Sequence, residues 1–268
     1  MSENGPIGVL DSGVGGLSVL REIRRDLPTE DLLYAADSGH APYGERTAAF
    51  IEARSVAIVE FFASVQAKAV VVACNTATSV AIDALRSRFS IPIVAIEPAL
   101  KPAAAATRSG TVAVLATSRT LESDKFAQLL SRYGTGINVL IQPCPGLVEQ
   151  VEKGDLFSRD TRLLVERYVL PLLEKGADIL VLGCTHYPFL DPLIRAVTGP
   201  SVSIIDPAEA VARELRRRLQ QRGLLSSRDR PGTERFWTSG APETVKRVVD
   251  RLWVTRVDVQ PLPSEARR

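Results

Sequence analysis

Short apolar segments alternate with longer amphipathic segments along almost the whole chain. The apolar segments span four or five residues each, and the amphipathic segments carry apolar residues at helical spacing. Strands are predicted at residues 7–10, 32–35, 69–73, 93–96, 112–115, 138–141, 179–182 and 202–205. Helices are predicted at 17–26, 47–65, 77–89, 123–133, 158–175 and 208–222. This alternation predicts an α/β fold of mostly parallel sheets flanked by helices, with a ligand at the carboxyl ends of the strands.

The two halves of the chain repeat three landmarks in the same order. They are the end of the first strand of each half, a cysteine followed by polar residues, and an acidic residue followed by Pro-Ala. The paired landmarks are Asp11-Ser12 and Ala116-Thr117, Cys74 and Cys184, and Glu97-Pro98-Ala99 and Asp206-Pro207-Ala208. Their offsets are 105, 110 and 109 residues, so we expect two similar α/β lobes related by pseudo-twofold symmetry.

The repeat also suggests where the chain crosses between lobes. Residues 1–98 are predicted to form the first lobe, completed by residues 208–268, and residues 99–207 the second lobe. The completing segment contains two further candidate strands, 236–238 and 254–259. The tail 261–268, rich in Pro, Ser and charge, is expected to be loose.

Charge and composition exclude several classes of protein. The 33 basic and 31 acidic residues nearly cancel, which argues against a nucleic-acid or membrane partner. The arginine-rich segment 213–222 is interleaved with leucines and is interpreted as the solvated face of a helix. No leader sequence or long apolar segment is present, and the three cysteines are odd in number, so we expect a cytoplasmic protein with reduced thiols. A homodimer is the assembly considered.

Cys74 and Cys184 each follow an apolar strand and precede small polar residues. A single cysteine in this place is usually a core residue. Two cysteines at equivalent places in two lobes are different, because they can face each other across the cleft and core packing gives no reason for the match. The start of a following helix favours a thiolate. Two opposed thiols can remove a proton from one face of a carbon and deliver one to the other, which is stereoinversion.

The glycine-rich segment 11–16 does not fit a nucleotide site, because position 18 is Ser18 rather than glycine and no Gly-Lys-Ser/Thr occurs. Asp11 is instead interpreted as a polar group at the strand end that either orders Cys74 and its partner or accepts a proton from an ammonium group, with a helix N-cap formed by Asp11 or Ser12 as the alternative. His186 is interpreted as the acid/base or orienting neighbour of Cys184. No metal site is predicted, since His40 and Cys144 supply no ligand set, and Cys144 is expected to be structural.

Four segments, in this order along residues 7–210, resemble the signature segments of glutamate racemases. They are Asp11-Ser12-Gly13-Val14-Gly15-Gly16, Pro42-Tyr43-Gly44, Ala73-Cys74-Asn75-Thr76-Ala77 and Gly183-Cys184-Thr185-His186-Tyr187-Pro188. The aspartate-specific members of the aspartate/glutamate racemase superfamily are less similar around the two cysteines.

The resemblance implies an isomerase that converts L-glutamate to D-glutamate for peptidoglycan synthesis, with two thiol bases and neither metal nor pyridoxal cofactor. It implies that Cys74 exchanges the proton of the D enantiomer, assisted by Asp11, and that Cys184 exchanges that of the L enantiomer, assisted by His186. The residues implied to bind substrate are Asp11, Ser12, Tyr43, Gly44, Asn75, Thr76, Thr117, Glu152, Thr185 and His186.

Two other functions stay open at this point. One is racemisation of aspartate or another acidic amino acid by the same chemistry. The other is a two-lobe protein that binds a small molecule without catalysis, because such proteins also close about a cleft. Binding alone gives no reason for the twin cysteines.

Overall fold

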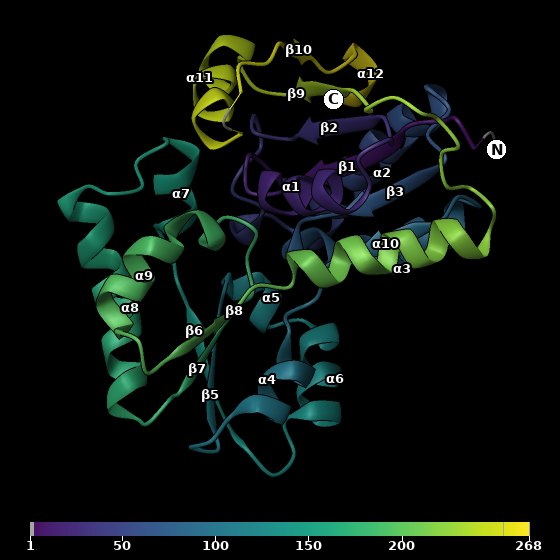
Figure 1. The fold of residues 1–268 in the computed structure, drawn as a ribbon. Coiled ribbons are helices and arrows are strands. Elements are labelled where there is room, and N and C mark those ends of the chain that lie inside the picture. The colour runs from purple at the N-terminus through teal and green to yellow at the C-terminus, as the bar shows by residue number, and fades with distance from the viewer. Residues whose placement is uncertain (1–2, 254, 268) are drawn as a thin grey trace.

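The computed structural model describes residues 3–253 and 255–267, which form two parallel sheets with helices on their faces (Figure 1). The six-stranded sheet has the order β10-β9-β2-β1-β3-β4, and the four-stranded sheet has the order β6-β5-β7-β8. The first sheet contains β1 (Ile7–Asp11), β2 (Leu32–Ala36), β3 (Ala69–Val72), β4 (Ile93–Ala95), β9 (Glu234–Thr238) and β10 (Val259–Pro261). The second contains β5 (Thr111–Ala116), β6 (Asn138–Pro143), β7 (Ile179–Leu182) and β8 (Ser203–Ile205).

The strand order confirms the repeat between the two halves. In both sheets the first strand of the half lies between the second and the third, so β2-β1-β3-β4 is matched by β6-β5-β7-β8. The eight strand pairings within the described residues are all parallel. The order in which strands are added therefore reverses beside β1 and beside β5, and the crevice at such a switch point is where α/β sheets bind ligands. The boundaries 98/99 and 207/208 stay a prediction.

The helices lie between the strands, and several begin at a side-chain cap. Thr47, Ser123 and Ser158 each accept a hydrogen bond from the backbone N–H three residues on, as N-cap residues do. The helices of residues 1–106 are α1 (Leu17–Asp26), η1 (Tyr43–Glu45), α2 (Ala48–Ser64), α3 (Asn75–Arg88) and α4 (Leu100–Ala106). Those that follow are α5 (Ser118–Leu121), α6 (Asp124–Tyr133), α7 (Leu147–Glu152), α8 (Arg159–Glu174), η2 (Tyr187–Leu190), α9 (Asp191–Thr198), α10 (Ala208–Gln221), α11 (Pro242–Leu252) and α12 (Ser264–Arg267).

The arginine-rich segment forms the outer face of α10, as predicted. Leu215 and Leu219 are buried, while the arginines between them are partly or fully exposed. Arg216 pairs with Asp26, and Arg217 and Arg218 both pair with Glu214. Its charge is therefore largely neutralised by neighbouring carboxylates.

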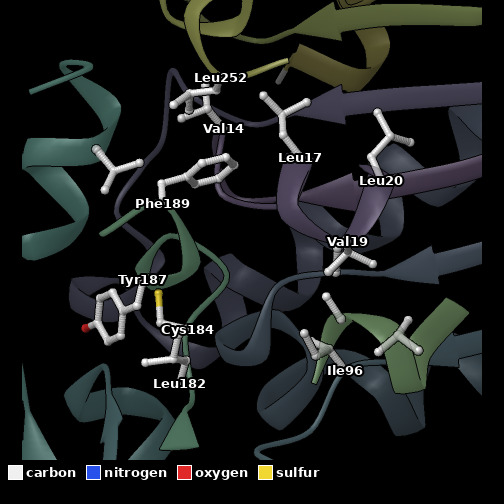
Figure 2. Close-up of a cluster of buried hydrophobic side chains, with 14 of the residues drawn as sticks. Val14, Leu17, Val19, Leu20, Ile96, Leu182, Cys184, Tyr187, Phe189 and Leu252 are labelled. Atoms are coloured by element: carbon white, nitrogen blue, oxygen red, sulfur yellow. The ribbon is translucent and has the colours of Figure 1, made fainter. Parts of the chain in front are cut away.

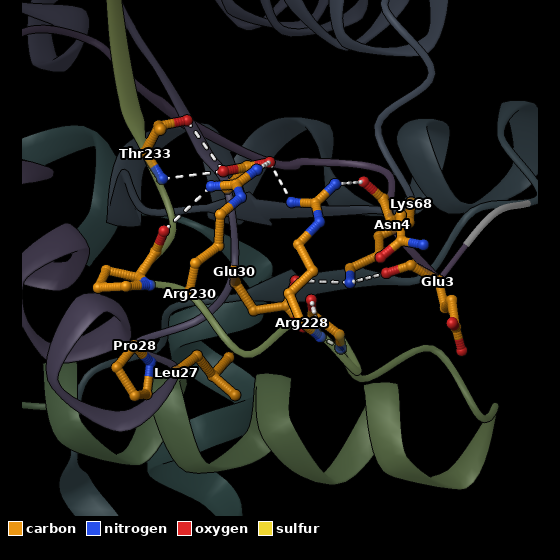
Figure 3. A network of polar contacts seen from close by, with 12 residues as sticks. Glu3, Asn4, Leu27, Pro28, Glu30, Lys68, Arg228, Arg230 and Thr233 are labelled. Carbon is orange, nitrogen blue, oxygen red and sulfur yellow. Dashed lines mark hydrogen bonds and ion pairs between the residues drawn. The ribbon is translucent and has the colours of Figure 1, made fainter.

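After α10 the chain returns to the first sheet through a polar network (Figure 3). Lys68 and Glu30 form a buried ion pair, and Glu30 also accepts the backbone N–H of Ser226 at 2.8 Å. Arg228 pairs with Asp31, whose Oδ1 also accepts the N–H of Thr233 at 2.8 Å. These contacts fix the returning segment so that β9 adds to β2.

The tail is not loose, so that prediction is wrong. Leu262 is fully buried, and its N–H donates to the carbonyl of Thr238 at 2.8 Å. Ala266 is also buried, and α12 packs against α2. The composition of the tail is polar, but two apolar side chains at this spacing reach the core. The strand predicted at 254–259 begins at Val254, outside the described residues, and β10 is found at Val259–Pro261.

One hydrophobic cluster runs through both lobes (Figure 2). Val14 and Leu17 of the first lobe meet Phe189 near Leu252, and Cys184 lies in the same cluster beside Tyr187. The two lobes are therefore joined here by packed side chains, which limit how far they can separate at this point. Across the described ranges 3–253 and 255–267, no helix has the length and apolar character needed to cross a membrane.

Candidate active site

Cys74 lies at the carboxyl end of β3 and is the N-cap residue of α3. Its side chain is buried, with 4% of its surface exposed. The sulfur accepts the N–H of Ala77 at 3.4 Å, and the S–H donates to Ser12 Oγ at 3.4 Å. The first N–H groups of a helix carry partial positive charge, so this position stabilises a thiolate when one forms.

Cys184 occupies the matching place after β7, where Gly183 separates it from the strand. Its sulfur is buried and lies 3.7 Å from His186 Nδ1. The other ring nitrogen, Nε2, lies 2.7 Å from Glu152 Oε1. The imidazole is thus held between a thiol and a carboxylate, which is how an orienting acid/base histidine is built.

Asp11 ends β1 and is fully buried. Its Oδ2 accepts the N–H of Gly13 at 2.9 Å, and its Oδ1 accepts the hydroxyl of Thr185 at 3.0 Å. Neither Asp11 nor Ser12 caps α1, whose N-cap is Gly16 with no side-chain hydrogen bond, so the N-cap alternative is wrong. The carboxylate instead stabilises the loop that follows β1, through Gly13, and binds Thr185, the residue after Cys184.

Glu152 belongs to the second lobe but bonds mainly with the first. Its Oε1 accepts the N–H of Val14 at 2.7 Å, and its Oε2 lies 3.4 Å from Ser38 Oγ. The glycine-rich segment 11–16 must therefore lie close to Glu152 and His186. A Cβ atom on Gly13 would lie 1.8 Å from Glu152 Oε1, and one on Gly15 would lie 2.3 Å from His186 Nδ1.

The Cys74 side is closed across the lobes by hydroxyl groups. Thr76 Oγ1 lies 2.9 Å from Thr117 Oγ1 and 3.3 Å from Thr120 Oγ1. Gly44 lies against the same group, since a Cβ added there would be 3.1 Å from the Thr117 Cβ. The side-chain oxygen and nitrogen of the buried Asn75 have no protein partner. Unpaired buried amides are costly, so this side chain is available to a ligand.

Tyr43 is placed differently from the other predicted binding residues. Its hydroxyl donates to Asp37 Oδ2 at 2.5 Å, and its side chain is buried. The phenol is therefore already used inside the protein. What Tyr43 and Gly44 can offer a ligand is their backbone N–H groups at the start of η1, which have no partner within that helix.

The ionisable groups of the two sides differ. Burial raises the pKa of Cys74 to about 12, and the nearby charges of Asp11 and Cys184 add to the rise. Burial also raises the pKa of Asp11, although His186 opposes the shift. Burial lowers the pKa of His186, but its hydrogen bonds to Cys184 and Glu152 outweigh this and leave it well above the usual value. At neutral pH Cys74 keeps its proton, and Cys184 faces an imidazolium.

Comparison with known proteins identifies the family of the chain. Residues 7–215 match the family described as Asp/Glu/Hydantoin racemase. Over 259 residues the chain is 56% identical to the glutamate racemase of Methylococcus capsulatus, covering 97% of this chain and 96% of the relative. The chain belongs to the glutamate racemase family. It is accordingly an isomerase, as the resemblance of its motifs predicted.

Solved glutamate racemases have the same fold. Isoform RacE1 from Bacillus anthracis superposes with a TM-score of 0.88 at 34% identity, covering 98% of this chain and 99% of that one. The Escherichia coli glutamate racemase, in complex with L-glutamate and the activator UDP-MurNAc-Ala, has a TM-score of 0.84 at 32% identity, covering 96% and 97%. The predicted two-lobe α/β fold is thereby confirmed.

Hydrogen bonds and close contacts link the four signature segments, directly or through Thr117, and two further residues that the sequence did not indicate take part. Ser18 Oγ lies 2.9 Å from the carbonyl of Gly15 and 3.0 Å from that of Thr185, so it joins the lobes behind Cys184. Thr120 joins them near Cys74. The repeat could have indicated Thr120, because the offset of 105 residues makes it the equivalent of Gly15 in the first half.

Cys144, unlike Cys184, forms no hydrogen bond with a histidine or carboxylate side chain among the described residues. Its S–H donates to the carbonyl of Gln142 at 3.4 Å, and its own carbonyl accepts the hydroxyl of Tyr187 at 3.4 Å. Burial raises its pKa, and so does the nearby Cys184. No group of three or more His, Cys, Asp or Glu residues that could hold a metal ion occurs within residues 3–253 and 255–267.

Proposed function

We propose that the protein interconverts L- and D-glutamate with Cys74 and Cys184 as the two acid/base groups, without metal or pyridoxal cofactor. The observation that carries the proposal is the pair of buried thiols at the carboxyl ends of the equivalent strands β3 and β7. The complex of the Escherichia coli relative with L-glutamate supports the choice of substrate. The product D-glutamate would be used for peptidoglycan precursors, and the protein would thereby contribute to cell-wall synthesis and cell shape. We expect it to act in the cytoplasm. A homodimer stays a prediction.

In the L-to-D direction, the Cys184 thiolate removes the α-proton from one face of the substrate. The electron pair moves into the α-carboxylate, which becomes enediolate-like, and Cys74 delivers its own proton to the opposite face. The pKa of about 12 fits Cys74 for this step, because the thiol is still protonated at neutral pH when substrate arrives. In the other direction the two thiols exchange roles.

The carbanion charge has to be stabilised by donors that are already in place. Hydroxyl groups of Ser12, Thr76 and Thr117 and the unpaired amide of Asn75 surround the Cys74 side. The starts of α3 and η1 both lie beside Thr117, through Thr76 and Gly44, and the free N–H groups of a helix start suit carboxylates. Asp11, with two oxygens and spare lone pairs, would accept the substrate ammonium group.

The proposal is tested by incubating the purified, chelator-dialysed protein with L-glutamate alone and separating the enantiomers by chiral chromatography. We expect approach to an equal mixture, because the equilibrium constant between enantiomers is one. Absence of D-glutamate, or activity that chelation abolishes and a metal ion or pyridoxal phosphate restores, would remove the mechanism. Faster turnover of L-aspartate under the same conditions would instead favour the second racemase function.

A further inference from the structure

A buried carboxylate, Asp37, organises the loop that follows β2. It accepts the Tyr43 hydroxyl at 2.5 Å and lies 3.0 Å from the ring nitrogen Nδ1 of His40. Tyr43 and His40 both belong to the segment 38–46, so the Asp37 carboxylate holds this loop in place through two side chains. Burial alone would raise the pKa of Asp37, but hydrogen bonds from Arg54, Ser239 and Tyr43 lower it overall, and the group is ionised.

The charge of Asp37 is matched by Arg54 of α2, whose side chain is only 2% exposed. Arg54 Nε donates to Asp37 Oδ2 at 2.9 Å and Nη2 donates to Oδ1 at 2.8 Å. This fork orients the carboxylate in a way that a single point charge cannot. The same Nη2 also donates to the carbonyl of Ala266 in α12 at 2.6 Å.

The last helix of the chain therefore contacts the arginine that holds Asp37. Its docking is fixed independently of Arg54, since Leu262 is fully buried and Ala266 is 3% exposed within the core shared with α2. Arg54 Nη1 is buried without a partner. Besides Asp37, the Ala266 carbonyl accepts a hydrogen bond from the guanidinium and helps to hold it in its plane.

The loop held in this way contributes to the cleft. Ser38 reaches Glu152, the carboxylate that bonds His186, and Gly44 lies against Thr117 of the opposite lobe. The first N–H groups of η1, at Tyr43 and Gly44, are the donors that the proposed function assigns to a substrate carboxylate. A small displacement of the loop would move these donors.

We propose that Arg54 and the Ala266 carbonyl of α12 are positioning groups for substrate binding: through Asp37 they set the place of the 38–46 loop. This inference rests on the proposed function for its effect on glutamate, but not for its effect on the loop. The C-terminal helix, far from the thiols in sequence, then acts on how tightly substrate is held and not on proton transfer.

The test compares a chain that ends at Pro263, which keeps Leu262, with Arg54→Lys and with both changes together. The lysine variant keeps a charge beside the buried Asp37 but loses the fork. The matched control is Glu265→Ala with Arg267→Ala, which removes two exposed side chains of α12 and leaves the Ala266 carbonyl in place. Circular dichroism and melting temperature confirm that each variant is folded, and Arg54→Lys carries the test if the shortened chain is not.

We expect KM for glutamate to rise about tenfold in the shortened chain and in Arg54→Lys, the size of one lost hydrogen bond to a charged group, with kcat changed less than about threefold. The combined variant should be no worse than the worse single one, because both changes act through Asp37. The control should match the parent. An unchanged KM, an effect confined to kcat, or effects that multiply in the combined variant would overturn the proposal.

A second readout needs no racemase activity. Amide hydrogen exchange of the ligand-free protein, followed by mass spectrometry, should be at least about fivefold faster in residues 38–46 of both variants, with β1 and β5 unchanged. Unaltered exchange in this loop would contradict the coupling. If the parent protein fails to racemise glutamate, the proposed function fails, while the exchange result still decides whether α12 and Arg54 fix the loop.

Discussion

The Cys74 side and the Cys184 side of the cleft are equivalent in topology and different in chemistry. Each cysteine follows the third strand of its half, β3 or β7, in sheets with the same strand order. Around Cys74 the sulfur forms hydrogen bonds with a hydroxyl and a backbone N–H. Around Cys184 it meets His186, which is itself held by Glu152. The fold thus places the two thiols alike, and the side chains that neighbour them differ: a hydroxyl beside Cys74 and an imidazole beside Cys184.

A single pair of matched positions shows how this difference is accommodated. Gly15 of the first half and Thr120 of the second occupy equivalent positions in the repeat. Gly15 leaves room for His186, whereas Thr120 fills the corresponding space and bonds the hydroxyl of Thr76. One side has a large ring against a glycine, and the other has two small hydroxyl residues in contact.

The largest effect should come from removing either thiol. Cys74→Ser and Cys184→Ser should each lower kcat/KM by about 10³, within the range that acid/base groups contribute. The loss must be equal in both directions, because the equilibrium constant between enantiomers stays at one. Initial rates from L- and from D-glutamate measure it. Cys144→Ser, the matched change at the remaining buried cysteine, should stay within about threefold, given the weak hydrogen bond it loses.

A serine variant at Cys74 or Cys184 that keeps near-normal kcat/KM would show that its thiol is not one of the two acid/base groups. A loss for Cys144→Ser as large as that for the other two would show that the comparison has the wrong pair of cysteines.

An intermediate effect should come from the positions that distinguish the two sides. Gly15→Ala would put a Cβ 2.3 Å from His186 Nδ1, so the ring must move and the contact with Cys184 changes. Overpacking of this kind costs about 1–3 kcal/mol, and we expect kcat to fall by about 10². Thr120→Ala removes one hydroxyl from the Thr76 group and should cost about fivefold. Steady-state kinetics and melting temperatures together separate loss of activity from loss of stability. A larger loss of kcat for Thr120→Ala than for Gly15→Ala would contradict the view that the Gly15 position matters more.

The smallest effect concerns the protonation state of Cys74. Because burial, with Asp11 and Cys184 nearby, raises its pKa to about 12, the rate of alkylation by iodoacetamide should rise about tenfold per pH unit from pH 7 to about 9.5 without levelling off. In the unfolded chain the same peptide should level off near pH 9. Peptide mass spectrometry follows both rates. Levelling below pH 9 in the folded protein would mean that Cys74 is not the thiol that keeps its proton.

Local sequence predicted what depends on local pattern. The β-branched runs before Cys74 and Cys184 indicated buried strands, and the repeat located both thiols at one edge. Contacts that depend on the lobes meeting could not be foreseen. Asp11 was open to an N-cap role because an acidic residue before a helix often has one, yet its partner Thr185 lies 174 positions away.

The same limit explains the tail and Arg54. A short segment with many polar residues gives no sign of docking, since the burial of Leu262 and Ala266 depends on where α2 lies. From the sequence, Arg54 of the predicted helix 47–65 is indistinguishable from a surface arginine until Asp37 and α12 are placed beside it.

The central claim is that each thiol serves one face of the α-carbon, and proton exchange with solvent tests it most directly. L-glutamate is incubated with the protein in deuterated water, and both enantiomers are separated early and analysed by mass spectrometry and NMR. The account predicts D-glutamate that carries deuterium at the α-carbon, since Cys74 delivers a solvent-derived proton, while the remaining L-glutamate keeps its original proton. Early D-glutamate that retains mostly the original α-proton would contradict the two-thiol mechanism.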